Sequence, residues 1–186
     1  MALNWPNTLT WIRIVAIPLI VVVFFLPVTW AGPAAGILFA LAGITDYLDG
    51  YLARKMGQTS RFGAFLDPVA DKLVVATALV LIVQRDPEIY LAIVAAIIIG
   101  REITVSALRE WMSESGASAK VSVSWFGKWK TTVQIIGISL MLFEQPIGPV
   151  PVYLVGEALL LVAAALTIIS MLDYLRSAWP TLRNSG

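Results

Sequence analysis

Four aspartates, Asp46, Asp49, Asp67 and Asp71, occupy two neighbouring segments of the sequence. On helices, Asp46 and Asp49 would share one face, and Asp67 and Asp71, four residues apart, would share another. Two such helices side by side bring four carboxylates to one cavity, where their repulsion must be relieved by protons or by cations. Oxygen donors of this kind favour Mg²⁺, Mn²⁺ or Ca²⁺.

A pair of divalent ions bridged by a carboxylate can hold a phosphoryl group and activate an attacking oxygen. Gly50 and Ala53 lie on the same expected helix face as Asp46 and Asp49, and their small size leaves room for a ligand beside the backbone. A carboxylate can also serve as a general base when it lies within hydrogen-bond reach of a hydroxyl. The residue types alone do not decide which of the four aspartates would do so.

The four aspartates also fit other roles. Asp67 can cap a helix whose first residue is Pro68, a role compatible with metal binding. Asp46 and Asp49 can form an acidic face at the membrane interface. A cation-transport site is the alternative from another functional class, but transport does not require small residues and an arginine at these fixed spacings.

Basic side chains form a second group. Arg101 and Arg109, two helical turns apart, project from the same side of a helix expected at 89–111, and Lys128 begins the helix expected at 124–143. Arginine at membrane depth usually faces a cavity or a partner, and its planar fork suits phosphate. The three residues therefore predict a phosphate pocket. The alternative is pairing with nearby acids, namely Glu102, Glu110 or Glu114.

Isolated polar residues on the expected helices give weaker signals. Asn7 can cap the first helix, and Arg13 can extend its charge to the membrane surface. Lys130 points away from Lys128, so we expect it to contact lipid headgroups or solvent. For Glu157, deep in the last helix, we expect a hydrogen bond to another helix.

The composition identifies the class of protein that must position these groups. Hydrophobic residues make up 59% of the 186 residues and charged residues 13%, against about 45–50% and about 25% in soluble domains. The absence of Cys and His excludes disulfides, thiolate or imidazole metal sites, and Cys-His or Ser-His nucleophiles. A net charge of +1 gives no basis for nucleic-acid binding.

Uncharged runs predict one all-α integral membrane domain over residues 1–186. Six transmembrane helices are expected near 14–30, 34–53, 68–84, 89–111, 124–143 and 150–175. Of the 13 Lys and Arg residues, all but Arg85 fall on one side of this topology. Because positive charge stays cytoplasmic, both termini are expected in the cytoplasm.

Taken together, these residues resemble a known family. The run Asp46-Tyr-Leu-Asp49-Gly50-Tyr-Leu-Ala53-Arg54, followed at fixed gaps by Gly63, Asp67 and Asp71, matches the whole signature of the CDP-alcohol phosphatidyltransferases. Segments 6–13, 101–110 and 127–131 are similar to those of bacterial members that make phosphatidylglycerophosphate. The likeness covers most of the chain.

The resemblance implies a six-helix enzyme of the bacterial inner membrane, usually a homodimer surrounded by membrane lipids, with its active site open to the cytoplasm. Such enzymes move the phosphatidyl group from CDP-diacylglycerol to an alcohol and release CMP. The basic pocket favours sn-glycerol 3-phosphate as the acceptor. Phosphatidylglycerol, serine or an inositol phosphate are the alternatives.

The resemblance also assigns site residues. Asp46, Asp49, Asp67 and Asp71 hold two divalent cations, Mg²⁺ or Mn²⁺, and Asp71 is the base for the acceptor hydroxyl. Gly50 and Ala53 make room for cytidine, and Arg54 contacts the pyrophosphate. The expected contacts of the CDP-lipid are Gly50, Ala53, Arg54, Gly63, Asn7 and Thr10. Those of the acceptor phosphate are Arg101, Arg109 and Lys128.

Overall fold

The computed structural model describes residues 5–56, 61–114 and 125–184, and within these it describes the side chains of residues 10–45, 66–113, 129–177, 179 and 183. This part of the chain forms six α-helices and contains no β-strand. The helices are α1 (Trp5–Phe24), α2 (Ala31–Met56), α3 (Arg61–Arg85), α4 (Ile89–Glu114), α5 (Trp125–Phe143) and α6 (Val152–Asn184). The six-helix prediction is confirmed.

Two helices begin more than one turn earlier than the sequence predicted. α1 begins at Trp5 instead of residue 14 and ends at Phe24, and α3 begins at Arg61 instead of residue 68. The prediction ended each apolar run at a charged residue, but a helix continues through such a residue when a neighbouring helix supplies a polar partner. Pro68 therefore lies inside α3, and the expected capping of this helix by Asp67 is wrong.

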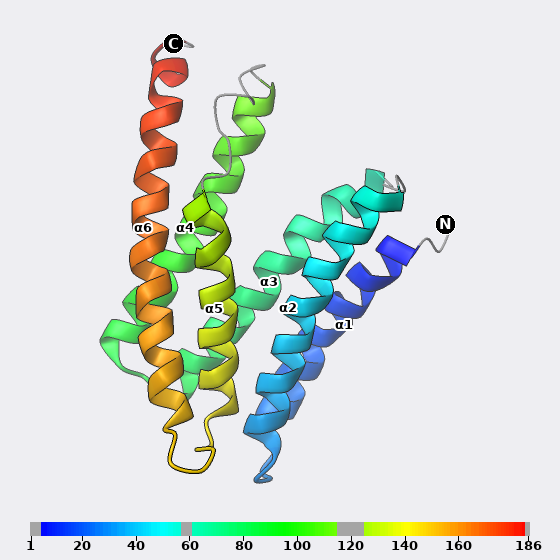
Figure 1. Cartoon of the computed structure of the whole chain (residues 1–186), viewed down its shortest axis with the longest axis vertical. Coiled ribbons are helices and arrows are strands. Elements are labelled where there is room, and N and C mark those ends of the chain that lie inside the picture. The colour runs from blue at the N-terminus through cyan, green and yellow to red at the C-terminus, as the bar shows by residue number, and fades with distance from the viewer. Residues whose placement is uncertain (1–4, 57–60, 115–124, 185–186) are drawn as a thin grey trace.

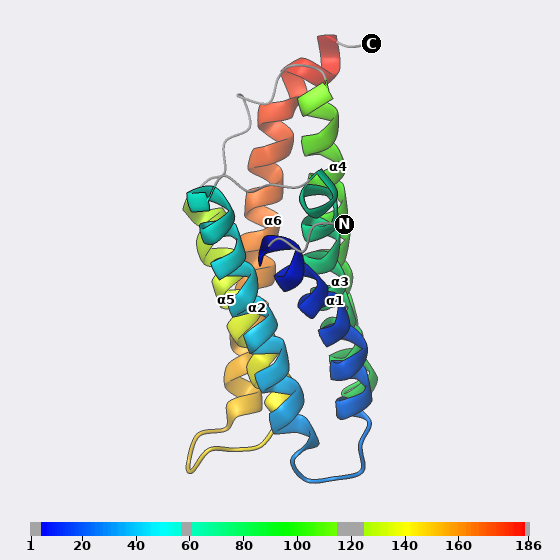
Figure 2. The ribbon, with the colours of Figure 1, turned by 90° about the vertical axis from the view of Figure 1, so that its right-hand side faces the viewer.

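The helices run alternately up and down, so that α1 begins and α6 ends toward the same end of the molecule, the upper end in Figure 1. Toward that end, α1, α2 and α3 lean away from α4, α5 and α6 (Figure 1). Figure 2 views the bundle from the side of α1, with α2 and α5 on the left and α3 and α4 on the right. α5 connects the two groups, because it packs against α6 on one side and against α2 on the other. We refer to the upper end as the site end.

Glycines bring α5 close to both of its neighbours. A Cβ atom added at Gly156 of α6 would lie 2.7 Å from the carbonyl oxygen of Gly137 on α5. One added at Gly36 of α2 would lie 2.6 Å from the carbonyl oxygen of Ser139, also on α5. Both distances are too short for a real side chain, so only glycine permits these contacts, as is common between membrane helices.

The outside of the bundle is apolar. Large hydrophobic side chains are exposed on all six helices, among them Val15, Ile37, Val80, Ile93 and Ile136. Such extensive exposed apolar surface is typical of a lipid-facing protein and not of a soluble monomer. Two of the described helical segments, Ile89–Ser113 and Val152–Ser177, are long and apolar enough to cross a membrane.

At the end opposite the site end, polar side chains form contacts between neighbouring helices and the turns that connect them. Tyr90 at the start of α4 donates a hydrogen bond of 2.6 Å to Glu157 on α6, which confirms the interhelical bond expected for this glutamate. Tyr153 of α6 donates one of 2.7 Å to Asp86, which follows α3. Arg85 forms an ion pair of 2.8 Å with Glu144.

Candidate active site

Two side chains of α1 hold the two carboxylates of α3. The Thr10 hydroxyl donates a hydrogen bond to Oδ1 of Asp67, and Nη1 of Arg13 lies 2.5 Å from Oδ1 of Asp71. The spacings make this possible, because residues three apart on one helix and four apart on its neighbour each share a face. α1 therefore fixes the orientation of both aspartates.

Arg13 is buried within the bundle. Only 2% of its side chain is exposed, whereas 38% of that of Asp71 is exposed. The expectation that Arg13 would extend to the membrane surface is therefore wrong, because the Asp71 carboxylate, one helix away, offers its charge a nearer partner than the headgroups do. The buried guanidinium of Arg13 therefore holds in place a carboxylate, that of Asp71, which is accessible.

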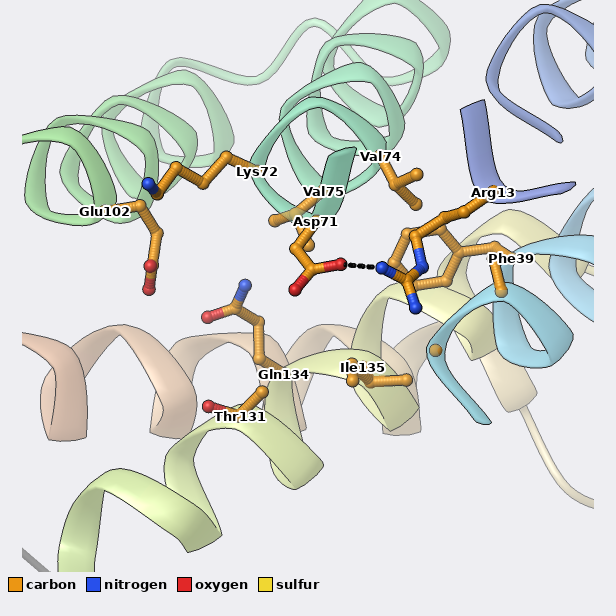
Figure 3. A pocket seen from close by; sticks show the side chains of 12 residues that line it. Arg13, Phe39, Asp71, Lys72, Val74, Val75, Glu102, Thr131, Gln134 and Ile135 are labelled. Carbon is orange, nitrogen blue, oxygen red and sulfur yellow. Dashed lines mark hydrogen bonds and ion pairs between the residues drawn. The ribbon is translucent and has the colours of Figure 1, made fainter. Parts of the chain in front are cut away.

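Asp71 faces a cavity of about 170 Å³, shown in Figure 3. The cavity lies between α1, α2, α3, α4 and α5, and it is far larger than the space that a single water needs. Its polar lining residues are Arg13, Asp71, Lys72, Glu102, Thr131 and Gln134. On α2 its wall includes Ala42 and Gly43, about one turn before Asp46. The cavity thus combines two cations, two carboxylates and neutral hydrogen-bonding groups.

Several of the predicted site residues lie where side chains are not described. Asp46, Asp49, Gly50, Ala53 and Arg54 belong to the last turns of α2. Gly63 lies at the start of α3, Asn7 in the first turn of α1 and Lys128 in the first turn of α5. Since α1 begins at Trp5, Asn7 is inside this helix and does not precede it. All eight backbone positions are at the site end, as expected for one site.

The two described carboxylates of α3, Asp67 and Asp71, are suitable ligands for a hard cation, but they do not form a complete metal site by themselves. Asp67 and Asp71 lie one turn apart on the same side of α3, and each receives its α1 contact on Oδ1. Among the described side chains, no group of three potential metal ligands occurs. Asp46 and Asp49, the other two predicted ligands, are outside this search. The chemistry of the donors fits Mg²⁺ or Mn²⁺, because all four are carboxylates.

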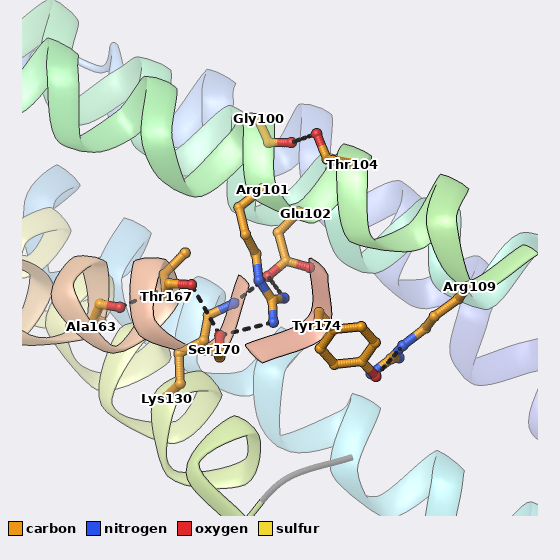
Figure 4. A network of polar contacts seen from close by, with 10 residues as sticks. All are labelled: Gly100, Arg101, Glu102, Thr104, Arg109, Lys130, Ala163, Thr167, Ser170 and Tyr174. Carbon is orange, nitrogen blue, oxygen red and sulfur yellow. Dashed lines mark hydrogen bonds and ion pairs between the residues drawn. The ribbon is translucent and has the colours of Figure 1, made fainter. Parts of the chain in front are cut away.

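A buried ionic cluster joins α4 to α5 and α6 (Figure 4). Oε1 of Glu102 lies 2.6 Å from Nζ of Lys130 and 3.1 Å from Nη1 of Arg101. Arg101 also donates a hydrogen bond of 3.1 Å from Nη2 to Ser170 on α6. The alternative raised for Arg101, pairing with Glu102, is therefore present in the structure. Nε of Arg101 is buried with no partner among the described residues.

The expectation that Lys130 contacts headgroups or solvent is wrong. Only 2% of its side chain is exposed, and its ammonium group points inward to Glu102. A buried ammonium requires a paired, hydrogen-bonded partner, and Glu102 on α4 supplies it. Lys128, on the opposite side of the helix by sequence spacing, is outside the described side chains.

Arg109 is held separately from this cluster. Its Nε and Nη2 donate hydrogen bonds of 2.8 and 2.6 Å to the hydroxyl of Tyr174 on α6. Ser170 and Tyr174 are one turn apart on α6, so Arg101 and Arg109 face the same neighbouring helix, as their spacing predicted. Neither arginine lines the cavity that contains Asp71. The structure therefore does not bring them into one pocket with that aspartate.

Gln134 is a residue of this site that the sequence reasoning missed. It lines the cavity from α5 and is 3% exposed. The sequence contained a signal for it, because burying a glutamine in an otherwise apolar membrane helix costs free energy unless the side chain has a specific partner. Its spacing from Lys130 and Thr131, four and three residues, also places it on their side of α5.

Comparison with known proteins supports the resemblance. The family model for CDP-alcohol phosphatidyltransferases matches residues 3–169. The chain is 49% identical to the CDP-diacylglycerol–glycerol-3-phosphate 3-phosphatidyltransferase of Escherichia coli strain K12 over 178 residues, which are 96% of each chain. The identity to the protein of the same name from Pseudomonas fluorescens is also 49%, over 99% of this chain and 94% of the relative. The chain therefore belongs to the CDP-alcohol phosphatidyltransferase family.

Proposed function

We propose that the protein transfers the phosphatidyl group of CDP-diacylglycerol to sn-glycerol 3-phosphate, forming phosphatidylglycerophosphate and CMP. In this reaction the free primary hydroxyl of the acceptor attacks the phosphorus that carries diacylglycerol. The bond from that phosphorus to the bridging pyrophosphate oxygen breaks, and CMP leaves. The names of the relatives from Escherichia coli and Pseudomonas fluorescens, which span nearly the whole chain, support this choice of substrates.

The observation that carries the proposal is the position of Asp71 in the wall of the cavity, oriented by Arg13. A general base must lie within hydrogen-bond reach of the hydroxyl that it deprotonates. Arg13 is buried but its partner Asp71 is partly exposed, so the Asp71 carboxylate is accessible to a small molecule in the cavity. In the proposed reaction, Asp71 accepts the proton of the acceptor hydroxyl.

Two divalent ions, Mg²⁺ or Mn²⁺, are proposed to be held by Asp46, Asp49, Asp67 and Asp71. When bound, such ions neutralise the charge of the pyrophosphate and acidify the attacking hydroxyl. The contacts from Thr10 and Arg13 prearrange the two α3 carboxylates for this role. Such ligands must be held in place by surrounding contacts if the ions are to be positioned accurately.

The CDP-lipid is proposed to lie beside the last turns of α2, where Gly50 and Ala53 leave room for cytidine and Arg54 contacts the pyrophosphate. Gly63, Asn7 and Thr10 complete the proposed contacts. All are at the site end of the helices. We place this end in the cytoplasm and propose that all six helices cross the bacterial inner membrane. We also propose that the enzyme acts as a homodimer.

The acceptor phosphate is proposed to bind to Arg101, Arg109 and Lys128, beside the cavity that contains Asp71 and not within it, since Glu102, the partner of Arg101, lines the wall of that cavity. Arg101 and Arg109 are oriented by α6, through Ser170 and Tyr174. Each guanidinium has five N–H groups, so these contacts leave donors for a ligand. The buried Nε of Arg101 that has no partner among the described residues supports such a use.

The direct test is CMP release from CDP-diacylglycerol by the purified protein in detergent with Mg²⁺ or Mn²⁺. We expect release to require sn-glycerol 3-phosphate and to stop in excess EDTA. Phosphatidylglycerol, serine and inositol phosphate are tested in parallel. A faster reaction with one of these would overturn the choice of acceptor, and full activity in excess chelator would overturn the role of the metals.

A further inference from the structure

The amide group of Gln134 is unusual among the polar groups of the cavity. The residue is 3% exposed, and its Oε1 has no hydrogen-bond partner among the described residues. In Figure 3 the side chain rises from α5 into the cavity, toward the space between Asp71 and Glu102. The amide therefore points at the position where a small molecule beside Asp71 would lie.

A buried amide oxygen that receives no hydrogen bond is unfavourable, and natural proteins keep few of them. The neighbouring contacts on the same helix show that the surroundings can satisfy such groups. Lys130, one turn before Gln134, is paired with Glu102, and Ser139 of α5 donates a hydrogen bond of 2.7 Å to the carbonyl of Ile135. The amide of Gln134 is different, because it faces a cavity and not another helix. A ligand in that cavity is the partner that would satisfy it.

The chemistry of the amide restricts what that partner is. The oxygen of the amide requires a hydrogen-bond donor and its NH2 group is itself a donor, so the amide matches a hydroxyl group, which both donates and accepts, better than it matches an anion. The cations of the cavity, Arg13 and Lys72, suit anionic groups instead. Asp71 is the proposed base for the reacting hydroxyl. A second hydroxyl on the same acceptor would therefore remain for Gln134.

We propose that Gln134 binds the secondary hydroxyl of the acceptor and so selects an acceptor with two neighbouring hydroxyl groups. This inference rests on the proposed function, because it takes glycerol 3-phosphate as the acceptor. Thr131, one turn before Gln134, lines the same part of the cavity. The acceptor is held at one hydroxyl by Gln134 while the adjacent primary hydroxyl faces Asp71.

The test compares two acceptors that differ by one hydroxyl. Glycerol 3-phosphate carries the secondary hydroxyl, and 3-hydroxypropyl phosphate lacks it. We expect the unaltered enzyme to prefer glycerol 3-phosphate by about threefold to tenfold in kcat/KM, the effect of one neutral hydrogen bond. Gln134→Met keeps the length of the side chain. In this variant the two acceptors should have about equal kcat/KM values, while the KM for CDP-diacylglycerol is unchanged.

The matched control is Gln84→Met, because Gln84 is an exposed glutamine on α3 at the other end of the bundle. It should retain the full preference between the acceptors. A second measurement is thermal unfolding followed by tryptophan fluorescence. Gln134→Met should unfold at the same or a higher temperature than the unaltered protein, because it removes a buried polar group that lacks a partner.

The outcomes separate this inference from the proposed function. A Gln134→Met enzyme that keeps the preference for glycerol 3-phosphate would overturn the role of Gln134 and leave the proposed function intact. So would a variant that loses activity equally toward both acceptors. An unaltered enzyme that releases no CMP with glycerol 3-phosphate would overturn the proposed function and this inference with it.

Discussion

Arg13 on α1 and Asp71 on α3 form an ion pair of 2.5 Å in which the cation is buried and the carboxylate is accessible. This asymmetry is informative, because a pair formed only for stability has no need to expose one partner to a cavity. The pair orients Asp71 and keeps one of its oxygen atoms, Oδ1, engaged by a protein group. It therefore links the packing of the first helix to the proposed chemistry on the third.

We expect Arg13→Met to lower kcat by at least about tenfold with little change in either KM. One charge-assisted hydrogen bond contributes roughly 1.5 kcal/mol at the lower end of its range, which corresponds to about tenfold in rate. The lower end applies because Asp71 is partly exposed. Arg13→Lys, which keeps the charge, should recover part of the loss. Equal kcat values for Arg13→Met and the unaltered enzyme would contradict the positioning role.

Asp71→Asn should abolish transfer while the protein still binds CDP-diacylglycerol. Asparagine has nearly the same shape, but it does not accept a proton from the acceptor hydroxyl. CMP release measures the loss, and equilibrium binding of the CDP-lipid to the purified variant tests whether the site remains formed. Substantial turnover by this variant would show that another group acts as the base.

Glu102 should be required for the stability of the upper half of the bundle. Removing its charge in Glu102→Gln leaves the buried Lys130 without a countercharge, for which we expect a loss of about 3 kcal/mol in the free energy of unfolding. This is the lower end of the usual range, because 29% of the Glu102 side chain is exposed. Urea unfolding in detergent, followed by tryptophan fluorescence, measures the change.

Two variants serve as controls for the Glu102 prediction. Glu110→Gln removes an exposed carboxylate from the same helix and should change stability by less than about 0.5 kcal/mol. The double variant Glu102→Gln with Lys130→Met removes both charges and should recover part of the lost stability. A double variant no more stable than Glu102→Gln alone would argue against the ion pair as the cause.

The contact between α5 and α6 should not tolerate a methyl group. Gly156→Ala places a Cβ atom 2.7 Å from the Gly137 carbonyl oxygen and forces the helices apart, so we expect a lower unfolding temperature. Gly100→Ala on α4 is the control, because a Cβ atom there meets nothing within 4 Å. It should be neutral or slightly stabilising, since alanine favours the helix. Equal effects of the two substitutions would refute the close-packing explanation.

The fold was largely predictable because uncharged runs separated by Pro, Gly and charged residues define membrane helices directly. Errors arose where a helix contains a charge. Arg13 and Asp67 were used as limits of apolar segments, yet each lies inside a helix and contacts a neighbouring one, Arg13 through Asp71 and Asp67 through Thr10. Such a pairing joins residues far apart in the sequence, and the helical period of either segment alone does not reveal it.

For the described polar residues, sequence spacing predicted the side of a helix better than it predicted the partner on another helix. The spacing of Arg101 and Arg109 correctly placed both on one side of α4. The direction of Lys130 was wrong, because it depends on Glu102, a residue of another helix. Gln134 was missed because the predicted pocket rested on charged groups, whereas an amide inside a membrane needs a hydrogen-bonding partner as well.

The last prediction concerns the acceptor phosphate and uses the contact between Tyr174 and Arg109. Tyr174→Phe removes the hydroxyl that receives two hydrogen bonds from Arg109 and leaves the aromatic ring, whose centroid is 5.1 Å from the guanidinium. The arginine keeps its charge but loses its orientation. We therefore expect the KM for glycerol 3-phosphate to rise about threefold to tenfold, as for the loss of one hydrogen bond.

Arg109→Ala removes the charge itself and should raise the same KM further, by about tenfold or more, with the KM for CDP-diacylglycerol unchanged in both variants. Arg176→Ala, an exposed arginine on α6, is the control and should leave both KM values as they are. If Tyr174→Phe and Arg109→Ala weaken the two substrates equally, Arg109 does not distinguish the acceptor. Its bond to Tyr174 would then serve only to join α4 to α6.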